Sequence, residues 1–166
     1  MVHVSWNDAR AYCAWAGGRL PTEAQWEYAA RGGLDGARYA WGDAVEPEGS
    51  MRGNIWRGAF PDAPAPGWTP SPVAADAYAP NGHGLFNACG NVWEWCADAF
   101  SAHYHRETAE VDPLGVGEGG AMRSMRGGSF LCHDSYCNRY RVAARNGNMP
   151  AGSASNIGFR LAANIS

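Results

Sequence analysis

The sequence contains no lysine and no long hydrophobic run, and only 17% of its 166 residues are charged. All 13 basic residues are arginines, and 16 acidic residues bring the net charge to −3. The arginines form no basic stretch that would follow a phosphate backbone, so we expect no binding to nucleic acid. No segment reaches the roughly 18–20 apolar residues that span a bilayer, and no signal peptide opens the chain, so we expect no membrane association either.

An even set of cysteines is also missing. The chain has five, and they are scattered along its length. A secreted disulfide framework normally needs an even number in a small domain, so this count predicts a reducing, cytoplasmic location. The five are Cys13, Cys89, Cys96, Cys132 and Cys137.

Turn-forming residues are abundant. With 22 glycines and 10 prolines, the chain has about 19% of these residues against a usual share of roughly 12%. This composition argues against a coiled coil or helical bundle and favours a loop-rich fold. Eight tryptophans provide large rings that can fill its core. The length predicts one domain over residues 1–166.

The sequence predicts two helices from residues that are typical of helix ends. Ser5 is a candidate N-cap for a helix that runs through Ala16 and stops at Gly17. Thr22 and Gln25 have capping-box spacing and predict a second helix to about Arg31, before a Gly-Gly pair.

The rest of the chain predicts loops and short strands. Seven prolines between positions 34 and 82 exclude a long helix there, and the aromatic residues among them favour an ordered loop over disorder. Gly127-Gly128 indicates a bulge or a close backbone approach. Residues 107–121 read as a polar loop, and strands are expected over 91–95, 124–131, 139–144 and 158–161.

Two thiols lie five residues apart, at Cys132 and Cys137. On a strand this offset places them on opposite faces, and on a helix about 140° apart. They meet only if residues 133–136 form a tight loop. Spacing alone leaves several interpretations open: two unrelated buried thiols, a redox-labile disulfide, or a pair that binds a soft metal or does redox chemistry.

The number of available ligands limits which metal the two thiols could bind. Structural zinc needs about four ligands, and iron–sulfur clusters usually need four thiolates. Only two thiolates lie together here, and His133 would have to turn back to join them. Two thiolates suit Cu(I), which is soft and accepts few ligands, and they leave a position open for a substrate thiolate.

A second cluster lies between Asn87 and Glu94. Amide and carboxylate oxygens separated by small residues can wrap a hard cation, with backbone carbonyls completing the shell. The stretch lacks the aspartate density of an EF-hand, so spacing alone indicates such a site only weakly.

Several motifs together resemble the sulfatase-modifying-factor family in order and spacing, from His3 to Leu161. The pair Cys132 and Cys137, flanked by Ser129 and Tyr140, is typical of the family's formylglycine-generating enzymes. The other motifs mark the broader superfamily: Arg19-Leu-Pro-Thr-Glu-Ala-Gln-Trp, Asn54-Ile-Trp, Asn81-Gly-His-Gly-Leu, Gly90-Asn-Val-Trp-Glu-Trp and Gly158-Phe-Arg.

The resemblance implies an α+β sulfatase-modifying-factor fold, C-type-lectin-like and low in regular secondary structure. It implies an oxidase that converts a cysteine in a Cys-x-Pro-x-Arg motif of an unfolded or nascent sulfatase to Cα-formylglycine, using O₂. Cys132 and Cys137 are expected to hold Cu(I), with the substrate cysteine as a third ligand. Ser129 and Trp93 match positions that place and gate oxygen, and Tyr136 lies beside a copper ligand.

The resemblance also implies calcium, which would fix loops rather than do chemistry. Asn87, Gly90, Val92 and Glu94 match one calcium site, the middle two through their carbonyls. A second site is expected at Asn54 and Ile55. There the family pattern has an aspartate before a glycine–aromatic pair, whereas this sequence has Pro66, with Asp62 as a candidate substitute.

The family pattern extends N-terminal to His3, where relatives carry strands and part of a substrate groove. The chain is therefore expected to be a fragment or a shortened relative. The main alternative to an oxidase is a non-catalytic, C-type-lectin-like binding module of the same superfamily. An iron-dependent sulfoxide synthase is disfavoured, because its histidine ligands lie largely in a separate helical domain.

Overall fold

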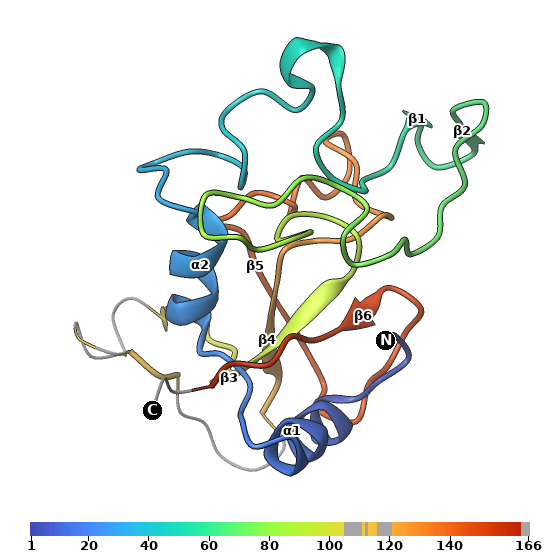
Figure 1. The fold of residues 1–166 in the computed structure, drawn as a ribbon. Helices are drawn as coiled ribbons and strands as arrows, with labels where there is room; N and C mark the ends of the chain where they lie inside the picture. The colour runs from blue at the N-terminus through green and yellow to red at the C-terminus, as the bar shows by residue number, and fades with distance from the viewer. Residues whose placement is uncertain (105–110, 112, 116–120, 164–166) are drawn as a thin grey trace.

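The structure is a computed structural model that describes residues 1–104, 111, 113–115 and 121–163. It is an α+β fold with little regular structure, as predicted (Figure 1). Within these residues no helix is both long and apolar enough to cross a membrane. The predicted polar loop 107–121 falls largely outside them. The elements are α1 (Trp6–Trp15), α2 (Glu23–Arg31), the 3₁₀ turn η1 (Pro47–Gly49), β1 (Gly58–Ala59), β2 (Ala63–Pro64), β3 (Trp93–Ala99), β4 (Arg123–Arg126), β5 (Arg145–Asn148) and β6 (Ile157–Gly158).

Both predicted helices form, and both begin with a capping box. The Ser5 hydroxyl accepts from the Asp8 amide at 3.2 Å, and Thr22 accepts from the Gln25 amide at the same distance. In each case the third residue's side chain accepts from the cap amide in return. Helix α2 ends at Gly32, whose φ of 58° is left-handed.

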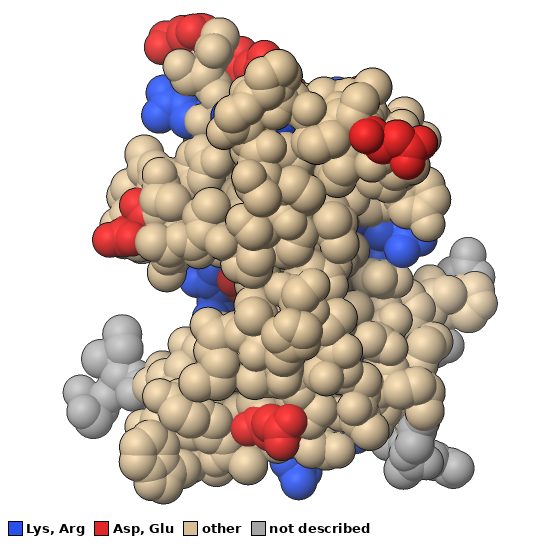
Figure 2. Space-filling view, turned by 90° about the vertical axis from the view of Figure 1, so that its right-hand side faces the viewer, with Lys and Arg blue, Asp and Glu red and all other residues tan. Residues whose placement is uncertain are grey.

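The main sheet has the order β5-β4-β3-β6. Strand β3 pairs antiparallel with β4 and parallel with β6, so it is central and almost wholly buried. In Figure 1 helix α2 and helix α1 lie on different sides of β3, and the long proline-rich loops cover one end of the molecule. Figure 2 shows that charged side chains are few and scattered on the face that carries β6 and the hairpin β1–β2.

Three of the predicted strands exist with shifted bounds. Strand β3 extends to Ala99 rather than ending at 95, and β6 covers only Ile157–Gly158. Strand β4 stops at Arg126, because Gly127 and Gly128 both have positive φ. A Cβ on Gly128 would lie 2.8 Å from the Tyr140 backbone nitrogen, which confirms the predicted close backbone approach.

The predicted strand over 139–144 is wrong. Its alternating apolar residues, Tyr140, Val142 and Ala144, are buried, but the backbone there forms turns. The Val142 amide donates to the Arg38 carbonyl in another loop at 2.8 Å. The strand at this edge is β5, which pairs antiparallel with β4 and has only partly buried residues.

The segment between α2 and β3 is an ordered loop built on aromatic rings. Tyr39 stacks on Trp41 at 5.3 Å and on Tyr140 at 5.5 Å between ring centroids. Trp41 packs against both of the buried hydrophobic clusters, one centred on Trp95 and the other on Trp26. These rings explain why a stretch so rich in proline has a fixed path.

A buried ion cluster joins α2 to the sheet. It consists of Glu23 and Glu27 from α2, Arg126 from β4 and Arg145 from β5. Glu23 and Arg126 are each 1% exposed. The Glu23 carboxylate accepts from Arg126 at 3.1 Å and from Arg145 at 2.6 and 2.7 Å, while Arg126 also pairs with Glu27. Each charge therefore meets an opposite charge, as burial requires.

Candidate functional site

The two predicted thiols meet in a tight bend. The carbonyl of His133 accepts from the amides of Tyr136, Cys137 and Asn138 at 2.9–3.1 Å, which folds residues 133–136 into one turn. The Sγ atoms of Cys132 and Cys137 lie 2.6 Å apart, and both are free thiols. We call residues 132–137 the thiol bend. This is the arrangement that the five-residue spacing required for any joint role of the two sulfurs.

The two thiols differ in their affinity for a proton. The hydrogen bond with Cys137 and burial raise the pKa of Cys132 far above the usual value. The hydrogen bond with Cys132, supported by Arg139, outweighs burial and lowers the pKa of Cys137 to about 6. Of the two, the half-buried Cys137 is therefore the thiol that loses its proton more readily. A thiolate is the form of cysteine that binds metals and attacks electrophiles.

Ser129 contacts the thiol bend, and Trp93 lies in the core cluster that contains Cys132. Ser129 is fully buried; its carbonyl accepts from the Cys132 amide at 2.9 Å, and its hydroxyl also hydrogen-bonds to Cys132. Asn156 Nδ2 donates to the same hydroxyl at 3.1 Å. Trp93 belongs to the buried cluster that contains Cys132. Ser129 therefore contacts the inner thiol directly, and Trp93 lies in the same buried cluster as that thiol.

Tyr136 lies on the outside of the bend and is 74% exposed. A pocket of about 460 Å³ opens beside the bend, with Trp56, His133 and Tyr140 among its lining residues. Neither thiol lines this pocket, but Cys137 is only partly buried, whereas Cys132 belongs to the buried core. Such a pair can accept a further ligand from outside without rearranging the core.

The metal-ligand set at the bend is small. Among the described residues, no group of three or more His, Cys, Asp or Glu side chains converges to hold a metal ion. His133 Nδ1 instead contacts Ser135 Oγ at 2.7 Å and Asp134 at 3.1 Å. Two soft thiolates without a third protein ligand fit Cu(I) and do not fit structural zinc.

The expected first calcium site is partly assembled. Asn87, Val92 and Glu94 line a pocket of about 380 Å³, whose described lining does not include Gly90. Asn87 Oδ1 is buried and has no hydrogen-bond partner among the described residues, while its Nδ2 donates to two backbone carbonyls. A buried oxygen without a partner is costly, and a hard cation is a suitable partner for it.

Glu94 is more heavily engaged than a dedicated calcium ligand. Its carboxylate accepts from Arg160 at 2.5 and 2.6 Å and from Trp26 Nε1 at 2.6 Å. A carboxylate has about four acceptor positions, so one remains available. The residues present therefore fit a calcium ion, with Glu94 shared between the cation and Arg160.

At the expected second calcium site, protein contacts already use much of Asn54. Its Nδ2 donates to the Ser71 carbonyl and to Asn91 Oδ1, and its Oδ1 accepts from Trp68 at 3.4 Å. Ile55 is part of the core. These contacts fix the Asn54 loop to Asn91. A cation is therefore less necessary to hold this loop in place.

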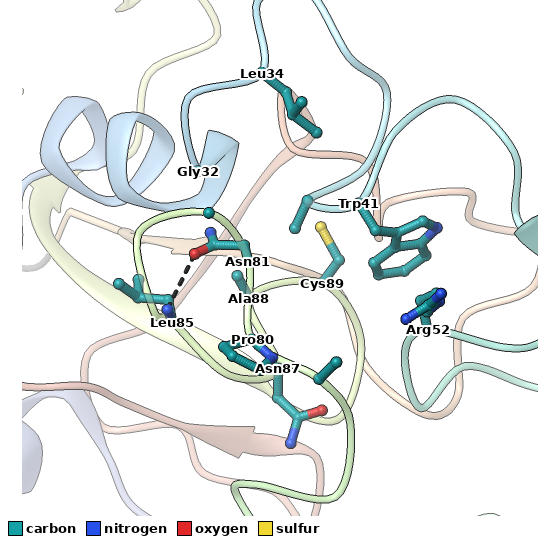
Figure 3. Close-up of a pocket in the computed structure, with 13 residues that line it drawn as sticks. Gly32, Leu34, Trp41, Arg52, Pro80, Asn81, Leu85, Asn87, Ala88 and Cys89 are labelled. Carbon is teal, nitrogen blue, oxygen red and sulfur yellow. Dashed lines mark hydrogen bonds between the residues drawn. The ribbon is translucent and has the colours of Figure 1, made fainter.

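Another pocket, of about 210 Å³, surrounds Cys89 between Trp41, Arg52 and the loop around Asn81 (Figure 3). Burial raises the pKa of Cys89 to about 12, so this thiol stays protonated and unreactive. Asn81 Oδ1 accepts from the Leu85 amide, and its Nδ2 donates to two carbonyls at the end of α2. The Asn81 motif thus has a structural role here.

Sequence reasoning missed the contacts that Trp56 and Phe60 make with the bend. The Trp56 amide donates to the Cys132 carbonyl at 3.1 Å. Phe60 stacks with His133 and with Tyr136. The sequence predicts only that these aromatic residues pack within their own loop, because no local pattern indicates a partner more than 70 positions away.

Comparison with known proteins identifies the family of the chain. The profile of the "Sulfatase-modifying factor enzyme 1-like domain" matches residues 1–165. The chain belongs to this family. The resemblance drawn from its motifs is therefore confirmed.

Relatives of this sulfatase-modifying-factor chain include catalytic and inactive proteins. It is 62% identical over 163 residues to the "Formylglycine-generating enzyme" of Streptomyces coelicolor, covering 98% of this chain and 52% of that protein. It is 46% identical over 168 residues to the "Inactive C-alpha-formylglycine-generating enzyme 2" of Bos taurus, covering 98% and 49%. The chain thus spans about half the length of these curated relatives.

A solved structure supports the fold. PvdO from Pseudomonas aeruginosa superposes with a TM-score of 0.76 at 26% identity, covering 96% of this chain and 60% of that one. The predicted sulfatase-modifying-factor fold is therefore confirmed.

Proposed function

We propose that the chain carries the thiol centre of a copper-dependent oxidase that converts a cysteine in a Cys-x-Pro-x-Arg motif of a sulfatase to Cα-formylglycine, using O₂. The observation that carries the proposal is the convergence of Cys132 and Cys137 in one bend, with Cys137 only half-buried. The names of the catalytic relatives support the conversion in general.

Each residue at the centre has a role in this proposal. Cys132 and Cys137 hold Cu(I), which when bound supplies one-electron chemistry with O₂ and a position for the client's sulfur. Ser129 orients Cys132 through its carbonyl and hydroxyl. Trp93 closes the inner side against water. Tyr136, on the outer side, faces the approach of the client.

We also propose calcium as a structural ion at Asn87 and Glu94, with the carbonyls of Gly90 and Val92. The unpartnered Oδ1 of Asn87 supports this assignment. A second calcium ion at Asn54 and Ile55 has weaker support, because the Asn54 side chain already has protein partners.

The test of the proposed function is product formation. The purified chain is loaded with Cu(I) and incubated in air with a peptide that carries Cys-x-Pro-x-Arg, and mass spectrometry follows the aldehyde. We expect product with the chain and with Cys13→Ala, which removes a buried thiol in α1, but none with Cys132→Ala or Cys137→Ala. Equal product from all four proteins, or none from the copper-loaded chain, contradicts the proposal.

A binding module remains the second candidate, because two relatives are named inactive. That candidate predicts that the chain binds the client peptide without converting it, and that Cys132→Ala leaves the peptide affinity unchanged. Fluorescence anisotropy with the labelled peptide, read beside the aldehyde assay, separates the two functions.

A further inference from the structure

A short hairpin lies against the thiol bend. Its strands β1 and β2 have two residues each, both exposed, and Phe60 follows β1 in the turn. Two strands of this length have little stability of their own in water. Contacts with the rest of the molecule must therefore fix the hairpin, and those contacts are aromatic.

Phe60 stacks with two residues of the thiol bend. Its ring centroid lies 5.9 Å from that of His133 with an interplanar angle of 4°, and 5.1 Å from that of Tyr136 with an angle of 19°. Trp56 meets the Phe60 ring edge-on at 5.2 Å and meets Trp68 in the same way. These separations are in the range of favourable aromatic pairs.

The segment from Trp56 to Phe60 therefore contacts the bend at both ends. At one end the Trp56 amide donates to the carbonyl of Cys132 itself. At the other, Phe60 covers Tyr136, the residue before Cys137. Because Tyr136 is largely exposed, the core contributes little to its placement, and the stack with Phe60 gains importance.

We propose that Phe60 is a positioning residue of the thiol centre. Its ring contacts with His133 and Tyr136 keep the bend closed, so that the sulfurs of Cys132 and Cys137 stay close enough to act on one ligand. This inference rests on the proposed thiol centre. It requires neither turnover nor copper for its test, because thiol proximity is measurable directly.

The test is thiol–disulfide equilibrium with glutathione at fixed pH. Oxidised glutathione accepts two electrons from Cys132 and Cys137, which lose two protons and form one disulfide, while two molecules of reduced glutathione are released. The equilibrium constant reports the effective concentration of one thiol at the other. Mass spectrometry after acid quenching gives the fraction oxidised.

We expect Phe60→Ala to lower this equilibrium constant about tenfold, as the loss of two aromatic contacts implies. Phe60→Leu keeps an apolar side chain without the ring stack, so its equilibrium constant is expected to lie between those of Phe60→Ala and the wild type. Phe60→Tyr keeps the stack and is expected to restore the wild-type value. A constant for Phe60→Ala within a factor of two of wild type would overturn the proposal.

The matched control is Tyr28→Ala. Tyr28 is 72% exposed, and its ring centroid lies 5.2 Å from that of His83 with an interplanar angle of 34°. The Tyr28→Ala substitution also removes a contact between an exposed aromatic ring and a histidine. It is therefore expected to change the melting temperature as Phe60→Ala does. It is expected to leave the glutathione equilibrium unchanged. An equal effect of both variants on that equilibrium makes the role merely structural and contradicts the proposal.

A double-mutant cycle adds an independent check. If Phe60 acts through Tyr136, the effects of Phe60→Ala and Tyr136→Ala on the equilibrium constant are less than multiplicative when combined. Fully multiplicative effects contradict the route through Tyr136. If the wild-type chain binds no Cu(I) but Phe60→Ala still lowers the constant, the proposed function fails and this inference stands.

Discussion

The buried ion cluster and the thiol bend are both built from reactive side chains, but they use them differently. In the cluster, Glu23 is paired with Arg126 and Arg145, which come from two neighbouring strands. In the bend, Cys132 and Cys137 are paired mainly with each other, and Cys137 is only partly buried. The cluster therefore commits its charges to holding α2 on the sheet, whereas the bend keeps donors available for a ligand.

The largest expected effect on stability is at the cluster. Glu23→Ala leaves Arg126 and Arg145 without their shared carboxylate, and breaking a buried pair costs about 3–5 kcal/mol. Urea unfolding measures this loss. The matched control is Asp35→Ala at an exposed position, expected within about 0.5 kcal/mol of wild type. A loss at Glu23 as small as the control's would remove the contrast between cluster and bend.

Calcium binding is expected to have the next largest effect on stability. If it binds at Asn87 and Glu94, calcium at about 100 times its dissociation constant stabilises the fold by about 2.7 kcal/mol. Thermal unfolding with and without a chelator shows the shift. Asn87→Ala is expected to abolish it, whereas Asn7→Ala, at an exposed position on α1, is expected to retain it. An equal shift in both variants rules out this site.

The smallest expected effect on stability comes from pH. Burial opposes ionisation of Glu27, but Arg126 and Arg31 outweigh it and lower its pKa. A carboxylate with a lowered folded pKa stabilises the fold above its unfolded pKa, and this stability is lost as pH falls through the folded value. Urea unfolding below about pH 4.5 is expected to show a shallower pH dependence for Glu27→Gln than for wild type. Identical slopes contradict the role assigned to Arg126.

The sequence predicted local features better than distant ones. The caps at Ser5 and Thr22 and the helix end at Gly32 depend on residues within one turn, so they could be read directly. The strand over 139–144 could not be excluded, because its buried alternation at Tyr140 and Val142 is real. The backbone partner that prevents a strand there lies in a distant loop.

The candidate site likewise has features that local sequence predicts and features that depend on distant segments. The five-residue spacing of Cys132 and Cys137 lets the two sulfurs meet only through a tight bend, and the structure contains that bend. The orphan oxygen of Asn87 and the stacking of Phe60 on the bend depend on segments far apart in sequence. No composition or spacing indicates them, because only the folded chain brings these groups together.

The central claim is that two sulfurs form a site for one cuprous ion. Cu(I) is titrated anaerobically into the metal-free chain against a chromophoric chelator, and bound copper is counted. We expect one tightly bound copper per chain in the wild type and in Cys13→Ala, and none in Cys132→Ala or Cys137→Ala. Unchanged copper binding after the loss of either thiol would contradict the account.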